Sequence, residues 1–125
     1  GFFFAMSRLL AFSLVFLGGG MGSIARYALY LLLRPWQQHF PWATLAANGL
    51  ACLALGFALG HGDWSEQRRL LIATGFCGGF STFSTFTAES WGLWQAGQHV
   101  AFFGNVFGSL ALCLLCLLLG LKLAA

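Results

Sequence analysis

A polar, glycine-rich segment interrupts an otherwise apolar stretch in the second half of the chain. The segment reads TGFCGGFSTFSTFT and covers Thr74–Thr87. The pair Gly78–Gly79 disfavours a helix interior by roughly 1 kcal/mol per glycine relative to alanine. Ser81 or Thr82 is a suitable N-cap for a helix that restarts afterwards. A break near Gly78–Thr82 would free backbone carbonyls that could coordinate a cation, while the N-terminus of the restarted helix would favour an anion.

Aromatic and hydroxyl side chains alternate directly after this segment's glycines. Phe83 and Phe86 are three residues apart and share one helix face, and Ser84 and Thr85 add hydroxyl donors on adjacent faces. The edge of an aromatic ring is electropositive, so a phenylalanine edge can contact an anion without holding it by a full charge. In the alternative interpretation the rings only pack and the hydroxyls bond back to the preceding turn. The residues alone leave both interpretations open.

Two further polar pairs with four-residue spacing occur in apolar stretches. Thr44 and Asn48 form the first pair, and Asn105 and Ser109 form the second. An asparagine amide offers two hydrogen-bond donors, which suits either an anion or a neighbouring helix. Interhelical hydrogen bonding is the simpler interpretation of both pairs.

Two charged residues also fall within apolar stretches. Arg26 precedes Arg34 by eight residues, which places it about 12 Å inside a helical span. It could reach the membrane interface or form a vestibule that attracts anions. Glu89 follows the broken segment and could cap a pore entrance or pair with a cation. Because charges are costly in lipid, a charged residue within a span indicates a functional role, and we expect one for both Arg26 and Glu89.

The composition of the chain indicates that it is surrounded by lipid and not by water. Of 125 residues, 59% are hydrophobic and 7% are charged, whereas soluble domains carry about 25% charged residues. A chain this short could not bury so much apolar surface by itself, so its solvent must be lipid. The net charge of +3 is spread out, with no basic run that would indicate nucleic acid. Only three acidic residues are present and no nucleophile–base or metal constellation is visible, so we do not expect an enzyme.

Four segments are long and apolar enough to cross a membrane as helices. A transmembrane helix needs about 20 apolar residues. The predicted spans cover residues 9–33, 41–60, 68–94 and 100–121, approximately. Glycines four apart recur in every span and predict close helix packing. We therefore predict an all-α membrane protein with a single domain over residues 1–125 and a break in its third helix.

The cysteines and the positive charges bear on packing and orientation. All four cysteines lie in apolar stretches, and we interpret them as small buried hydrophobes rather than disulfide partners or ligands. With four spans, both termini lie on one side of the membrane. Four positive residues fall on that side and one on the other, which favours cytoplasmic termini. The four are Arg8, Arg68, Arg69 and Lys122, and the one is Arg34.

Together these features resemble the Fluc family of fluoride channels, and the likeness covers essentially the whole chain. Four segments carry it, of which the third is highly specific. They are GGGMGSIARY in Gly18–Tyr27, TLAAN in Thr44–Asn48, GFCGGFSTFSTF in Gly75–Phe86, and Asn105–Ser109.

The resemblance implies a fluoride-selective channel for passive fluoride export and protection from fluoride toxicity. It implies a multi-pass protein of the cell (inner) membrane that pairs as an antiparallel, dual-topology homodimer with two pores. By the same resemblance, Phe83 and Phe86 line the pores by their ring edges and Asn48 is a pore donor. The polar track would consist of Ser84, Thr85 and Ser109.

The resemblance also implies a structural sodium ion at the dimer interface. Its ligands would be the backbone carbonyls of Gly78 and Ser81 from both subunits. Arg26 matches the family's arginine at the aqueous vestibule, and Glu89 matches an acidic position of less defined role. Cys113 departs from the pattern, since some relatives have a second serine there.

Three alternatives remain at the level of the sequence. The charge bias of four to one is at odds with dual insertion, so the chain could instead pair with an oppositely oriented paralogue. A small multidrug-type antiporter also has four helices, but it needs an acidic residue deep in its first helix, and Arg26 is the only deep charge there. A non-transporting membrane scaffold would explain the glycine spacing but not the hydroxyl-rich break.

Overall fold

The computed structural model describes residues 2–125, with side chains from Arg8 onward. Within that part of the chain the secondary structure is helical, and no strand is present. Four helical stretches are long and apolar enough to cross a membrane, as predicted. They are Arg8–Leu32, Trp42–Gly60, Glu66–Gln95 and His99–Ala124.

Three of the spans are single helices. Helix α1 (Phe2–Leu32) begins earlier than predicted and is followed by a short 3₁₀ turn, η1 (Arg34–Trp36), which contains the proline expected to stop it. Helix α2 (Trp42–Gly60) starts directly after Pro41. Helix α6 (His99–Ala124) extends slightly beyond its predicted end.

The third span is built from several pieces. It comprises α3 (Glu66–Arg68), the π-helical segment η2 (Arg69–Cys77), α4 (Gly78–Phe80) and α5 (Phe83–Gln95). Between α4 and α5, Ser81 (φ −82°, ψ 156°) and Thr82 (φ −155°, ψ 121°) have extended backbone angles. The helical path is therefore interrupted within the stretch Gly78–Thr82. The wide π-helical winding before it was not predicted, because hydrophobic periodicity does not separate the two windings over nine residues.

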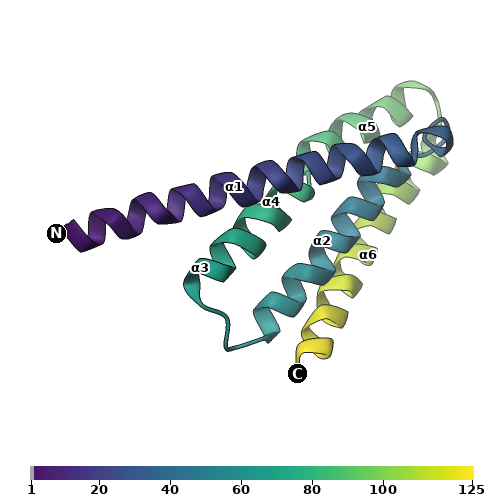
Figure 1. Cartoon of the computed structure of the whole chain (residues 1–125). Helices are drawn as coiled ribbons and strands as arrows, with labels where there is room; N and C mark the ends of the chain where they lie inside the picture. The colour runs from purple at the N-terminus through teal and green to yellow at the C-terminus, as the bar shows by residue number, and fades with distance from the viewer. Residues whose placement is uncertain (1) are drawn as a thin grey trace.

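The helices pack in two closely matched pairs (Figure 1). Helix α2 runs along α6, and α1 crosses the η2 and α4 pieces of the third span. Helix α5 returns along α6, which agrees with the antiparallel neighbours that the short connection predicts. Because α2, α5 and α6 share one end of the bundle, the residues after the interruption face both other helices.

Glycines allow both close pairings. A Cβ atom on Gly56 of α2 would collide with the Leu117 carbonyl oxygen of α6, and one on Gly120 would collide with the Leu53 carbonyl oxygen. Between α1 and the third span, a Cβ on Gly18 would collide with the carbonyl oxygen of Leu71. The predicted close approach of helix backbones is therefore found at these two contacts.

Small residues rather than large ones fill the centre of the bundle. The buried hydrophobic residues are Ala43, Ala47, Ala51, Ala58 and Cys77. Many large apolar side chains point outward instead, including Phe12, Phe16 and Leu115. This distribution suits a lipid-exposed bundle, in which helices associate through packing and not through removal of apolar surface from water.

Candidate functional site

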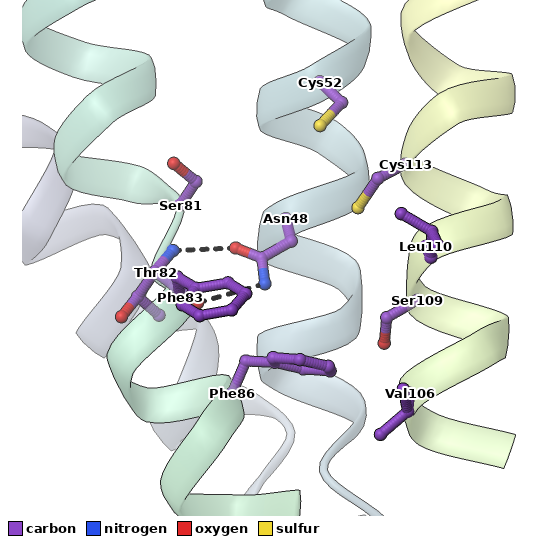
Figure 2. A pocket seen from close by; sticks show the side chains of 10 residues that line it. All are labelled: Asn48, Cys52, Ser81, Thr82, Phe83, Phe86, Val106, Ser109, Leu110 and Cys113. Carbon is purple, nitrogen blue, oxygen red and sulfur yellow. Dashed lines mark hydrogen bonds between the residues drawn. The ribbon is translucent and has the colours of Figure 1, made fainter. Parts of the chain in front are cut away.

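A cavity of about 460 Å³ lies between α2, α5 and α6, beside the interruption of the third span (Figure 2). Most of the expected pore residues line it, and the cavity is open at the surface of the protomer. The lining residues are Asn48, Cys52, Ser81, Thr82, Phe83, Phe86, Val106, Ser109, Leu110 and Cys113.

Asn48 of α2 clamps the backbone of the interruption. Its Nδ2 donates to the Thr82 carbonyl oxygen at 3.2 Å, and its Oδ1 accepts from the Thr82 backbone N–H at 2.8 Å (Figure 2). The side chain thus satisfies both backbone groups of one residue in an extended conformation, much as a neighbouring strand would. One Nδ2 hydrogen is left for the cavity, because an amide carries two. The clamp confirms the interhelical hydrogen bonding that the sequence favoured for Asn48, although its backbone partner was not predicted.

Thr82 is the N-cap of α5, in agreement with the sequence. Its hydroxyl oxygen accepts from the Thr85 backbone N–H at 3.2 Å and lies 3.3 Å from the Ser84 hydroxyl. Neither Ser84 nor Thr85 lines the cavity. These two members of the expected polar track therefore lie beside the cavity and not in its wall.

The interruption diverts two backbone donors from their usual acceptors. In a continuous α-helix the Thr82 N–H would bond to the Gly78 carbonyl, and the Thr85 N–H would bond to the Ser81 carbonyl. Here the first N–H goes to Asn48 and the second to the Thr82 hydroxyl. The carbonyls of Gly78 and Ser81 are consequently released from these two helical bonds.

Arg26 of α1 contacts the interruption on the side away from Asn48. Its Nε donates to the carbonyl oxygen of Gly79 at 3.2 Å, in a half-buried position. A positive charge is favourable at this C-terminal end of a helical segment, where carbonyls lack helical partners. Arg26 is outside the lining of the cavity, and its contact is with the break itself.

The two phenylalanines stand at the open side of the cavity. Their ring centroids are 5.8 Å apart, with an angle of 42° between the ring planes. Phe83 is 80% exposed in the protomer, whereas Phe86 is half-buried and extends toward α6 (Figure 2). Both rings thus border the same space as the Asn48 amide and the Ser109 hydroxyl.

A chain of hydrogen bonds links Ser109 to the backbone of α5. The Ser109 hydroxyl donates to Asn105 Oδ1 at 3.2 Å, and Asn105 Nδ2 donates to the Ser90 hydroxyl at 2.9 Å. The Ser90 hydroxyl in turn donates to the Phe86 carbonyl at 2.8 Å. Asn105 is only 1% exposed, so the interhelical interpretation is confirmed for it. Ser90 was missed in the sequence, although its place four residues after Phe86 puts it on the same helix face.

Glu89 lies in a different cavity. This second space of about 250 Å³ is enclosed by the connection between α1 and α2 and the end of α5. One carboxylate oxygen, Oε1, is buried without a hydrogen-bond partner among the described residues, and the Thr44 side chain contacts the carboxylate. The structure therefore separates Glu89 from the cavity that contains Phe83 and Phe86.

The fold and the cavity define a small multi-pass helical membrane protein with an amide, hydroxyls and aromatic rings gathered at an interrupted helix. The family model described as "CrcB-like protein, Camphor Resistance (CrcB)" matches residues 13–121. The chain belongs to this family.

Curated relatives cover nearly the whole chain. A protein of Phocaeicola vulgatus is 40% identical over 112 residues, which are 86% of this chain and 93% of the relative. One from Pyrococcus furiosus is 40% identical over 116 residues, 90% of this chain and 94% of the relative. One from Serratia proteamaculans is 41% identical over 124 residues, 91% and 94% of the two chains. All three relatives are named "Fluoride-specific ion channel FluC".

Proposed function

We propose that this chain is the subunit of a fluoride-selective channel that releases fluoride passively from the cell and so protects it from fluoride toxicity. Relatives that are about 40% identical over most of the chain carry the name of such a channel. The observation that carries the proposal is the cavity in which Asn48, Ser109 and both phenylalanines meet. Its lining offers donors and ring edges but no full positive charge.

This chemistry suits the transport of a small, strongly hydrated anion. Conduction requires binding that replaces the hydration shell yet stays weak enough for the ion to leave. The free Nδ2 hydrogen of Asn48, the Ser109 hydroxyl and the ring edges of Phe83 and Phe86 supply such modest donors in sequence. Ser109 shares its proton with Asn105 over a long 3.2 Å bond, so its hydroxyl can turn toward a passing anion. Ser84 and Thr85 continue the polar path beyond the cavity.

We propose that the functional unit is an antiparallel homodimer with two pores. The cavity is open on the protomer surface, and Phe83 and the hydroxyl-bearing Ser84 are exposed near the interruption. Irregular backbone and polar groups at membrane depth are tolerated only when protein covers them or water reaches them. A second copy would cover them, and an oppositely oriented paralogue is the alternative partner that the charge bias suggests.

A sodium ion at the dimer interface is part of this proposal. The carbonyls of Gly78 and Ser81 would be its ligands, and their release from two helical bonds makes them available. Carbonyl oxygens are the donors that hard cations prefer. The ion would add positive charge that holds the two interrupted helices together.

The oppositely charged Arg26 and Glu89 would belong to the aqueous vestibules, with Arg26 attracting anions.

The test is ion efflux from liposomes that contain only the purified chain. We expect fluoride efflux, recorded with a fluoride electrode, and no chloride efflux under the same gradient. An antiporter would instead show proton uptake driven by a cationic drug, and a scaffold would show no flux of any kind. Chloride efflux at the fluoride rate would contradict the proposed selectivity.

A further inference from the structure

Two cysteines from different helices lie in the same part of the wall of the main cavity. Cys52 of α2 and Cys113 of α6 both line it, next to Asn48 (Figure 2). The two thiols interact electrostatically with each other, and both are free cysteines. The sequence interpretation as small buried hydrophobes does not account for two thiols from different helices in one cavity wall.

The other two cysteines are placed differently. Cys77 of η2 is 4% exposed and lies outside the main cavity, although it shares a smaller neighbouring space with Cys52. Cys116 follows Cys113 by less than one helical turn, and its sulfur packs near Gly49 of α2 instead of lining the cavity. Cys77 and Cys116 are therefore natural controls for the pair.

The donor set restricts which ions the pair could bind. Among the described residues no group of three or more His, Cys, Asp or Glu side chains could hold a metal, so a tetrahedral zinc site is not supported. Thiolates are soft ligands that favour soft ions. Two neighbouring sulfurs suffice for a soft cation that accepts two-coordinate binding. Such an ion would displace both thiol protons, form two metal–sulfur bonds and release two H⁺, which removes the need to bury free thiolates.

We propose that Cys52 and Cys113 form a two-thiolate site for a soft, two-coordinate cation such as Cu⁺, Ag⁺ or Hg²⁺, and that its occupation closes the pore. The bound ion would bridge α2 and α6 beside Asn48 and fill part of the path between the phenylalanines and the far end of the cavity. The binding site rests on the shared position of Cys52 and Cys113 in the cavity wall, whereas the closure rests on the proposed channel function.

Binding is tested with mercuric chloride on the purified chain in detergent. The chain is desalted in excess β-mercaptoethanol, a monothiol that removes mercury from single cysteines but competes poorly with a preorganised pair. We expect one mercury per chain in the unsubstituted protein, and retention lower by about tenfold or more in Cys52→Ser and in Cys113→Ser. Cys77→Ser and Cys116→Ser should retain mercury. Full retention in Cys113→Ser, or loss in Cys77→Ser, would overturn the assignment of the pair.

Closure is tested by fluoride efflux from liposomes, with each variant normalised to its own rate before mercury. We expect mercuric chloride to stop efflux in the unsubstituted chain and a dithiol to restore it, whereas Cys52→Ser and Cys113→Ser should need about tenfold more mercury. Unchanged efflux with mercury bound would overturn the closure and leave the binding site in place. An absence of fluoride efflux before any mercury is added would count against the channel function and not against the site.

Discussion

At the residue scale, the phenylalanines carry the sharpest prediction of the pore. Replacing Phe83 or Phe86 by isoleucine keeps an apolar side chain but removes the electropositive ring edge. We expect Phe83→Ile and Phe86→Ile each to lower fluoride efflux from liposomes by about tenfold or more, equivalent to about 1.4 kcal/mol. Phe12→Ile, at an exposed position of α1 far from the cavity, is the matched control. Near-normal efflux in both pore variants would refute the assignment.

Asn48 holds the backbone of Thr82 and has a proposed role in conduction, which an aspartate substitution tests. The aspartate in Asn48→Asp can still accept from the Thr82 N–H, but it cannot donate to the Thr82 carbonyl at 3.2 Å. It also brings a negative charge to the path of an anion. We expect fluoride currents to disappear in planar bilayers, while the purified variant stays folded by circular dichroism. A clear fluoride current through this variant would remove Asn48 from the pore.

Asn105 holds together the hydrogen-bonded chain that links α6 to α5. Asn105→Ala would leave the Ser90 and Ser109 hydroxyls without their present partner in a buried place. A buried group that loses its hydrogen bond costs about 1–3 kcal/mol. We expect the detergent-solubilised variant to unfold at a lower temperature than Thr87→Ala, whose exposed hydroxyl bonds only within its own helix. Equal melting temperatures of the two variants would show that the hydrogen bonds of Asn105 contribute no stability.

At the element scale, the close crossing of α1 with the third span depends on missing side chains. Gly18→Ala would press a methyl group against the Leu71 carbonyl oxygen and bring it within 3.0 Å of the Phe76 nitrogen. Gly20→Ala, two residues along the same helix, would meet nothing within 4 Å. We therefore expect the first variant to lose thermal stability and fluoride efflux together. The second should match the unsubstituted chain or gain up to about 1 kcal/mol from helix propensity.

The spans were predictable from the sequence because lipid imposes a minimum apolar length on each helix. Local signals also sufficed for the stop at Pro35 and narrowed the N-cap of α5 to Ser81 or Thr82, of which the structure uses Thr82. The directions of side chains between helices were not predictable, since they depend on helix crossings that no local pattern encodes. For this reason the clamp by Asn48, the shared cavity of Cys52 and Cys113 and the separate cavity of Glu89 became visible only in the folded chain.

At the scale of the whole molecule, the proposed dual insertion can be tested by labelling the two opposite ends of the helical bundle. Gly62→Cys marks the connection between α2 and α3, and Ala96→Cys marks the opposite end, beyond α5. With a membrane-impermeant maleimide on sealed vesicles, we expect about half of each variant to be labelled from outside, as equal populations of two orientations require. The unsubstituted chain supplies the background from its native cysteines. Complete labelling of one variant and none of the other would indicate a single orientation.

The clamp on Thr82 also bears on the order in which the protein is made. Asn48 precedes Thr82 by 34 positions. The ribosome therefore synthesises Asn48 before the segment whose backbone it will bind. When the third span enters the membrane after α2, the amide of Asn48 is already in place to bond the N–H and the carbonyl of Thr82. Insertion from the N-terminus toward the C-terminus shortens the time that an irregular backbone spends unsatisfied in lipid. A circular permutant that synthesises the third span before α2 would lose this order of synthesis.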